Sequence, residues 1–325
     1  MAPPRSAFGA PPLGGAASGP AKPVPRRPLD RAGLWRRMVP PLLAFLACLP
    51  VHAAVQVKDD AGTTITLARP AQRIVSLAPH LTELLFAAGA GAQVVGVGAY
   101  SDFPAAAKAL PRVGDAAMLD LERILALKPD LLVVWRDGNS PQQLQRLSTL
   151  GIPVYASELG HLADIASTLR RFGRLAGTEA AANARADGFE QELQALRQRY
   201  AGRPTLRVFY QIWHRPLLTI NDRHLISESL HICGARNVFG TLAPLTPTVS
   251  EEAVVAQDPD AIVTARAGTD GPDHLDTWRR LTQLSATRRG ALLAVDPDTL
   301  HRSSDRLPEG IRGLCEKLDG VRRAP

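Results

Sequence analysis

From residue 54 onward, short apolar runs alternate with stretches whose apolar residues recur at helical spacing. Runs rich in Val, Ile and Leu predict buried strands, and apolar residues three or four positions apart predict helices. We expect strands at residues 73–77, 94–98, 130–135, 152–155, 206–210 and 260–264, and helices at 82–89, 121–127, 227–234 and 252–256. Strands that alternate with helices are typical of an α/β fold.

The same order of patterns occurs twice along the chain. A shift of 130 residues places Glu122 on Glu252 and Asp130 on Asp260, and a shift of 145 residues places Glu83 on Glu228. Because both matches come in the same order, they favour two related lobes with pseudo-two-fold symmetry. We assign them to residues 54–157 and 204–325.

A helical stretch over residues 158–203 connects the two lobes. Apolar residues at helical spacing predict one helix up to Gly177, and Thr178 is expected to cap the next. A helix over residues 178–200 would be about 35 Å long, enough to bridge two domains. A helical connection is stiffer than a loop, so we expect the lobes to keep a nearly fixed geometry.

The N-terminal 53 residues have a different composition. They carry seven basic residues and one acidic residue, so the rest of the chain has a net charge of only +1, not the +7 of the whole. Arginines, an apolar stretch at 39–50 and the small-residue site at 51–53 predict a leader with a secretory signal peptide. Cys48 fits a lipoprotein signal less well, so a periplasmic protein is the main expectation. Basic residues do not cluster with aromatic residues in the rest of the chain, so we do not expect nucleic acid as a partner.

Two cysteines, Cys233 and Cys315, remain after such a signal is removed. An even pair in an oxidising compartment favours a disulfide, with two buried thiols as the alternative.

Sequence signatures of hydrolases, nucleotide-binding loops and zinc proteases are absent, and the histidines are scattered. We therefore expect neither a catalytic residue nor a resident metal site. Instead, Tyr100 and Trp213 follow predicted strands, and Trp135 ends one. Aromatic residues beyond strand carboxyl ends can stack on a flat ligand, although Trp135 and Trp213 fit a core position equally well.

Glu122 and Glu252 fall in the first turn of equivalent predicted helices. A carboxylate at this position stabilises the helix dipole. Alternatively, one exposed acid per lobe could bind arginines of a pseudo-symmetric partner through bidentate bonds.

Several segments together resemble the family of periplasmic cobalamin-binding proteins of ABC importers, within a wider group that binds haem and iron-siderophores. The similarity covers residues 70–318, and its motifs lie at 73–84, 96–104, 120–131, 135–139, 207–209, 233–239, 247–252 and 314–315. It implies two Rossmann-like lobes joined by one long rigid helix, with the ligand in the cleft between them. It also implies a monomeric, non-enzymatic protein without a cofactor, whose transported ligand is cobalamin or a related corrinoid.

The resemblance also assigns roles to residues. It implies that Tyr100, Trp135 and Asp298 line the ligand cleft, and it places Trp213 in the corresponding segment of the second lobe. It further implies that Glu122 and Glu252 dock onto arginines of an ABC permease dimer, through which the protein would contact the inner membrane. Cys233 and Cys315 match the disulfide pair of the family.

The chain departs from the family at two positions, Ala116 and Thr246, where well-known members carry tryptophan. These departures leave cobinamide or another corrinoid open as the ligand. A ferric siderophore or haem would keep the same fold, with Arg136 and Arg215 as the obvious cleft arginines. A remote alternative is a secreted hydrolase using Ser304, His301 and Asp298.

Three histidines remain open as contacts to the metal of a bound ligand: His80, His214 and His301. Nothing in their spacing requires such a contact.

Overall fold

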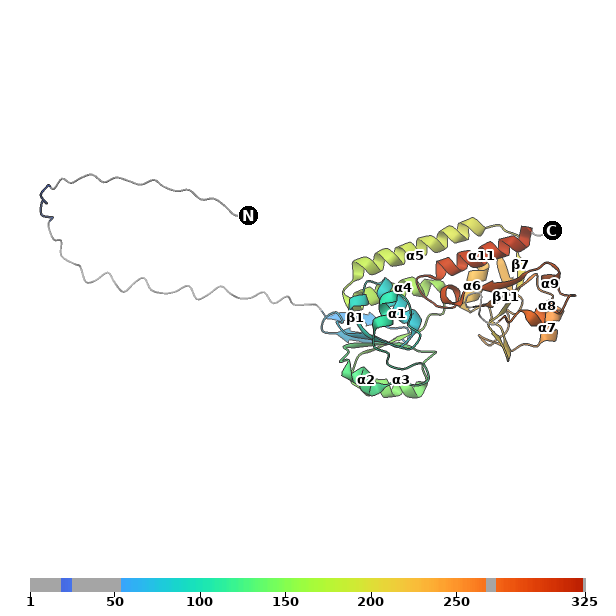
Figure 1. The fold of residues 1–325 in the computed structure, drawn as a ribbon, viewed down its shortest axis with the longest axis horizontal. Helices are drawn as coiled ribbons and strands as arrows, with labels where there is room; N and C mark the ends of the chain where they lie inside the picture. Colours follow the sequence, from blue (N-terminus) through green and yellow to red (C-terminus); the bar gives the residue numbers. More distant parts are fainter. Residues whose placement is uncertain (1–18, 25–53, 267–272, 324–325) are drawn as a thin grey trace, which may run out of the picture. The chain divides into compact units, whose positions relative to one another are not determined.

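Two four-stranded parallel sheets organise the chain (Figure 1), as the alternation of strands and helices predicts. The computed structural model describes residues 19–24, 54–266 and 273–323. Its described residues from 54 onward belong to one compact unit. The predicted secretory signal, including Cys48, lies outside the described residues.

The first sheet has the strand order β4-β3-β5-β6. Its strands are β3 (Ile74–Ser76), β4 (Val94–Val97), β5 (Leu131–Trp135) and β6 (Val154–Ser157). Its helices and 3-10 turns are α1 (Pro79–Ala87), η1 (Gly91–Gln93), η2 (Ala105–Ala109), α2 (Leu121–Ala126) and α3 (Pro141–Ser148). An antiparallel hairpin, β1 (Val55–Lys58) with β2 (Thr64–Leu67), precedes this sheet. Because β3 lies between β4 and β5, the chain leaves the carboxyl end of β3 at a topological switch point.

The second sheet repeats this order as β10-β7-β11-β12, with β7 in the position of β3. Its strands are β7 (Leu206–Gln211), β10 (Ala235–Asn237), β11 (Ala261–Ala265) and β12 (Leu292–Val295). Around it lie α6 (Leu225–Ile232), α7 (Glu251–Gln257), α8 (Asp276–Arg279), α9 (Ser285–Arg288), α10 (Pro297–Leu300), α11 (Leu307–Arg323) and the hairpin β8 (Trp213–His214) with β9 (Leu217–Leu218). Equal strand orders support the predicted relation between the lobes.

Each sheet carries helices on both faces. In the first, Ile74, Leu131 and Val133 pack in the core shared with α1 and α4, whereas alternate residues of the same strands pack in a second core with α2 and α3. Figure 1 shows α2 and α3 on the side of this sheet away from α1. In the second sheet, α6 and α11 cover one face, and α7, α8 and α9 cover the other. Near-continuous burial of both faces explains the apolar runs of the strands.

Two helices, α4 (Leu162–Ala176) and α5 (Glu179–Tyr200), connect the sheets. They meet at Gly177, whose φ of +71° ends α4 in the left-handed conformation, as the sequence predicts. Thr178 is the N-cap residue of α5, as expected, but its side chain makes no capping hydrogen bond, because its hydroxyl donates to the carbonyl of Ala88 at 2.7 Å. Helix α5 contacts α1 and α4 and also α6 and α11, so it packs against elements of both sheets.

Among the described residues, no helix combines the length and apolarity that crossing a bilayer requires.

Candidate functional site

Tyr100 is presented to solvent just beyond the carboxyl end of β4. Its φ of +63° lies in the left-handed region, which costs a non-glycine residue about 1–2 kcal/mol, and its side chain is 76% exposed. The turn that follows is held because Arg112 donates from Nη1 to the carbonyl of Ser101 at 2.8 Å. The ring of Tyr100 therefore does not pack in the core and is accessible to another molecule.

Trp135 ends β5 on the other side of β3. Its ring lies 5.3 Å from that of His80 in an edge-on arrangement, with the two planes at 87°. The turn after the strand folds closely over the indole, since a Cβ on Gly138 would lie 1.8 Å from the Trp135 ring. The indole therefore has a fixed orientation while it keeps 39% of its surface exposed. This mixed position, part packed and part exposed, falls between the two alternatives that the sequence leaves open.

Asp298 lies on α10, beyond the carboxyl end of β12, and belongs to an ion-pair cluster that spans both lobes. Arg302 contacts Glu83 at 3.0 Å, Asp102 at 2.5 Å and Asp298 at 3.0 Å. Arg306 donates to both carboxylate oxygens of Glu83, at 3.0 and 2.9 Å. We call these five residues, Glu83, Asp102, Asp298, Arg302 and Arg306, the Arg302 cluster.

The Arg302 cluster contains one of the predicted ligand residues and adjoins residues that contact two others. Asp298 is a member, and Asp102 follows Tyr100, whose carbonyl accepts from the Asp102 backbone N–H at 3.0 Å. Arg302 also acts electrostatically on His80, the ring that packs against Trp135. The sequence analysis did not identify Arg302 or Glu83 as site residues. Their pairing joins positions 219 residues apart, which no local pattern reveals.

The charged surface that this cluster presents is mainly carboxylate. The Asp102 and Asp298 side chains are 50% and 55% exposed, whereas those of Arg302 and Arg306 are 17% and 18% exposed. A hydrogen bond from Arg302 holds the pKa of Asp102 below its usual value, so this carboxylate stays ionised. Burial, with a smaller contribution from Arg302, lowers the pKa of His80 to about 4 and keeps this ring neutral.

Trp213 is placed on a different feature, the hairpin β8–β9 that follows the carboxyl end of β7. It is 55% exposed, and its indole N–H donates to the carbonyl of Arg215 at 3.0 Å. The adjacent His214 ring stacks on that of His274, with centroids 4.0 Å apart. Strand β9 also pairs with the segment that contains Thr246, since Val249 donates its N–H to Leu217 and Leu218 bridges to Thr248.

Glu122 and Glu252 occupy equivalent positions in the two lobes, as expected. Each is the second residue of its helix, after the N-caps Asp120 and Ser250, whose side chains accept from backbone N–H groups at 2.9 and 3.2 Å. Both glutamates are exposed. A hydrogen bond from Ser250 lowers the pKa of Glu252.

Cys233 and Cys315 form a disulfide in the structure, with Cα atoms 4.7 Å apart. It joins the end of α6 to α11 on one face of the second sheet. Of the two alternatives left open by the cysteine count, the structure therefore contains the bonded pair.

The three residues of the hydrolase alternative do not assemble. Ser304 is buried and its hydroxyl oxygen accepts from the backbone N–H of Arg306, while Nε2 of His301 lies 2.7 Å from the Tyr210 hydroxyl. Asp298 pairs with Arg302. Across the described ranges, no group of three or more His, Cys, Asp or Glu side chains is arranged to hold a metal ion.

Of the histidines considered as contacts to a ligand metal, two are committed elsewhere. His80 packs against Trp135 and is 9% exposed, and His301 is engaged by Tyr210. His214 is exposed beside Trp213.

Two similar α/β lobes, packed on a shared helix and carrying aromatic side chains at the carboxyl ends of both sheets, define a two-lobed binding protein. Comparison with protein families gives the same class. The chain belongs to the periplasmic binding protein family, whose model matches residues 74–299.

Individual proteins that are similar to this chain include vitamin B12-binding and haem-binding proteins. A vitamin B12-binding protein of Vibrio parahaemolyticus is 33% identical over 262 residues, which cover 80% of this chain and 94% of the relative. The crystal structure of the periplasmic vitamin B12-binding protein BtuF of Vibrio cholerae matches with a TM-score of 0.71 and 34% identity, covering 78% of this chain and 99% of that one. A periplasmic haem-binding protein from Pseudomonas aeruginosa matches with a TM-score of 0.66 and 29% identity, covering 78% and 94% of the two chains.

Proposed function

We propose that this protein captures a corrinoid between its two lobes in the periplasm and delivers it to an ABC permease. The observation that carries the proposal is the position of three exposed aromatic side chains. Tyr100 and Trp135 flank the switch point of the first sheet, and Trp213 follows the equivalent strand of the second. A flat macrocycle held by aromatic contacts from both lobes fits this arrangement. The similarity to vitamin B12-binding proteins of Vibrio supports the same ligand class.

The charged side chains near the aromatic residues favour a corrinoid over haem or a ferric siderophore as the ligand. The guanidinium groups near Tyr100 and Trp135 are occupied, because Arg302 and Arg306 bind Glu83 and Arg136 pairs with Glu158 at 2.7 Å, whereas Arg215 beside Trp213 is exposed. Within the Arg302 cluster, the exposed groups are mainly the carboxylates of Asp102 and Asp298, whose oxygens accept hydrogen bonds. The peripheral carboxamides of a corrin ring can donate to such oxygens, whereas haem propionates and siderophore anions would be repelled.

Trp213 can supply the aromatic wall that the substitution by Thr246 removes. Strand β9 of its hairpin pairs with the segment that contains this threonine, so Trp213 on β8 and Thr246 lie on neighbouring strands of one local β structure. We propose Tyr100 and Trp135 as contacts on one side of the ligand, and Trp213 and Asp298 on the other. No covalent chemistry is part of this function.

Calorimetric titration of the purified protein with cyanocobalamin, dicyanocobinamide, haem and a ferric siderophore tests the ligand class. We expect at least one corrinoid to bind with a Kd below about 10 µM, which corresponds to about −7 kcal/mol, and the two anionic ligands to bind more weakly. If neither corrinoid reaches this affinity, the proposal fails, and tight binding of haem would replace it with the haem alternative.

Delivery is tested through the equivalent glutamates. We propose that Glu122 and Glu252 contact arginines of the permease, so a variant with both changed to Ala should lose corrinoid uptake in cells while it keeps the ligand affinity of the wild type. Weaker ligand binding by this variant would instead assign the glutamates to the ligand pocket.

A further inference from the structure

The backbone of Trp135 lies where β5 no longer has a neighbouring strand on one side. In a parallel sheet, the N–H and C=O groups of alternate residues point to the same neighbour. The Val133 carbonyl accepts from the Leu77 N–H on the β3 side, whereas the Arg136 N–H donates to β6. Trp135 is two residues after Val133, so its N–H and C=O also face the β3 side, although β3 ends at Ser76. The sheet therefore offers neither group a strand partner.

Asn139 supplies both of the missing partners. Its side-chain oxygen Oδ1 accepts from the Trp135 N–H at 3.1 Å, and its backbone N–H donates to the Trp135 carbonyl at 3.0 Å. One residue thus closes the turn 135–139 onto the last residue of the strand. Asn139 is only 4% exposed, so both hydrogen bonds are shielded from water.

The closed turn determines where the indole of Trp135 lies. It holds Gly138 so near the ring that a Cβ would come within 2.3 Å of three ring atoms. The His80 ring meets the same indole edge-on. Because the turn fixes the backbone from which the indole projects, a change in the turn would alter the surface that the indole exposes.

The amide of Asn139 also carries a cost that stability does not explain. Its nitrogen Nδ2 is buried and has no hydrogen-bond partner within the described part of the chain. A buried donor without an acceptor is unfavourable. A leucine side chain has nearly the same shape and would avoid this cost, but it would offer no acceptor to the Trp135 N–H.

We propose that Asn139 is a positioning residue of the ligand site, which holds the Trp135 indole in the orientation that contacts the corrinoid. The proposal rests on the proposed function above and extends it from the aromatic side chain to the group that orients it. A ring that is already fixed in the free protein loses little conformational freedom when the ligand binds. Asn139 therefore contributes to affinity without touching the ligand.

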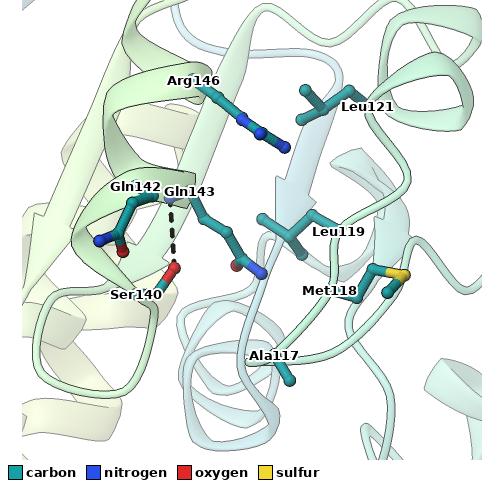
Figure 2. Close-up of a pocket in the computed structure, with 8 residues that line it drawn as sticks. All are labelled: Ala117, Met118, Leu119, Leu121, Ser140, Gln142, Gln143 and Arg146. Carbon is teal, nitrogen blue, oxygen red and sulfur yellow. Dashed lines mark hydrogen bonds between the residues drawn. The ribbon is translucent and has the colours of Figure 1, made fainter.

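Ser140, the next residue along the chain, provides a control whose role is structural. It is the N-cap of α3, and Figure 2 shows its hydroxyl bound to the backbone N–H of Gln143, at 3.3 Å. The hydroxyl thus stabilises the helix and not the turn around the indole. Ser140→Ala should lower the melting temperature without changing the affinity for a corrinoid.

Two variants of nearly equal volume separate the acceptor from the packing. Asn139→Leu removes the acceptor, whereas Asn139→Asp keeps an oxygen beside the N-terminus of α3, where the helix dipole favours a carboxylate. Asn139→Leu is also combined with Trp135→Ala. Calorimetry with cyanocobalamin and dicyanocobinamide measures the Kd of each purified variant, and near-UV circular dichroism of the apoprotein reports on the environment of the indole.

We expect Asn139→Leu to weaken corrinoid binding by about fivefold or more and to change the near-UV signal that Trp135→Ala removes. Asn139→Asp should keep this signal and bind within about twofold of the wild type, because the acceptor is retained. In the Trp135→Ala protein, Asn139→Leu should cause no further loss of affinity, since the residue through which it acts is already gone.

Wild-type affinity in Asn139→Leu would overturn the positioning role. An equal loss of affinity with and without Trp135 would also overturn it, because Asn139 would then act by another route. The same would follow if Ser140→Ala weakened binding as much as Asn139→Leu, since any damage near α3 would then suffice. Failure of the wild-type protein to bind either corrinoid would overturn the proposed function instead. In that case an unchanged near-UV signal in Asn139→Leu would still overturn the positioning of Trp135, and a changed signal would support it.

Discussion

Glu83 is the most deeply buried charge of the Arg302 cluster, since its side chain has no exposed surface. Both its oxygens accept from guanidinium groups of the other lobe. Changing Glu83 to Ala would remove a carboxylate that both Arg302 and Arg306 bind. Each guanidinium would then stay largely buried without this partner. Removal of one member of a buried ion pair typically costs 3–5 kcal/mol, and the partial exposure of both arginines favours a loss of about 3 kcal/mol. Urea unfolding of the apoprotein measures this change.

The control for this prediction is Arg136→Ala. Arg136 and Glu158 form an ion pair that is 49% and 41% exposed, so its loss should change the unfolding free energy by less than about 1 kcal/mol. Equal effects of the two variants would mean that the Arg302 cluster does not stabilise the contact between the lobes.

The two tryptophans allow a sharper test of the ligand contacts. Trp213 stands on a short exposed hairpin, so Trp213→Ala should weaken corrinoid binding by about tenfold or more without changing the melting temperature. Trp135 also supports His80 and the turn at Gly138. Trp135→Ala should therefore reduce both affinity and stability. Calorimetry and thermal unfolding of both variants separate the roles, and unchanged affinity in Trp213→Ala would remove this residue from the ligand site.

At the scale of the elements, local pattern predicts the repeated parts well. The predicted strand at 130–135 is β5, and its counterpart at 260–264 is β11, displaced by the same 130 residues. The sequence also predicts correctly that Glu122 and Glu252 lie in the first turns of their helices, because a polar N-cap residue precedes each helix. Strand β12 and the short helices α8–α10 were not predicted. The apolar run around β12, residues 291–295, has the pattern of a buried strand and was overlooked, whereas the short helices contain few periodic apolar residues and pack on the second sheet.

The site was less predictable than the fold. Aromatic residues after strands could be recognised because strand ends are local features. The Arg302 cluster could not, because Glu83 lies on α1 and Arg302 follows α10. The repeat does carry one relevant signal. Glu228, the residue equivalent to Glu83, also binds outside its own helix, contacting Nδ1 of His161 at 2.5 Å and accepting from the Leu162 backbone N–H. Equivalent glutamates therefore join distant segments in both halves.

The crossing of α4 and α5 depends on one glycine. A Cβ on Gly173 would lie 2.3 Å from that of Ala182. Gly173→Ala should therefore lower the unfolding free energy by about 1–3 kcal/mol, although alanine is the better helix former. Gly188, in the middle of α5, meets only the end of the Arg185 side chain at 3.6 Å, so Gly188→Ala should raise stability by up to about 1 kcal/mol. Opposite signs in urea unfolding are expected, and stabilisation by Gly173→Ala would contradict the close packing.

For the whole molecule, three buried histidines predict how stability depends on pH. Burial lowers the pKa of each of His80, His224 and His301 to about 4. Their unfolded value is about 6.5, so between pH 6.5 and 4 the unfolded chain binds more protons than the folded one. The stability from keeping these rings neutral is therefore present above pH 6.5 and is lost as the pH falls through this window.

The same pKa values predict how much unfolding free energy is lost at low pH and which variants should change that loss. Each histidine should lower the unfolding free energy by about 2 kcal/mol between pH 7.5 and 5.0, and urea unfolding at both values measures the sum. Glu228 raises the pKa of His161, so the wild type gains stability from this pair as the pH falls, and His161→Gln should make the loss between pH 7.5 and 5.0 larger. His80→Gln should remove about a third of it, because one of the three neutral rings is gone. A pH-independent unfolding free energy in the wild type would mean that these histidines have the same pKa values in the folded and unfolded protein, which the packing of His80 against Trp135 beside Arg302 opposes.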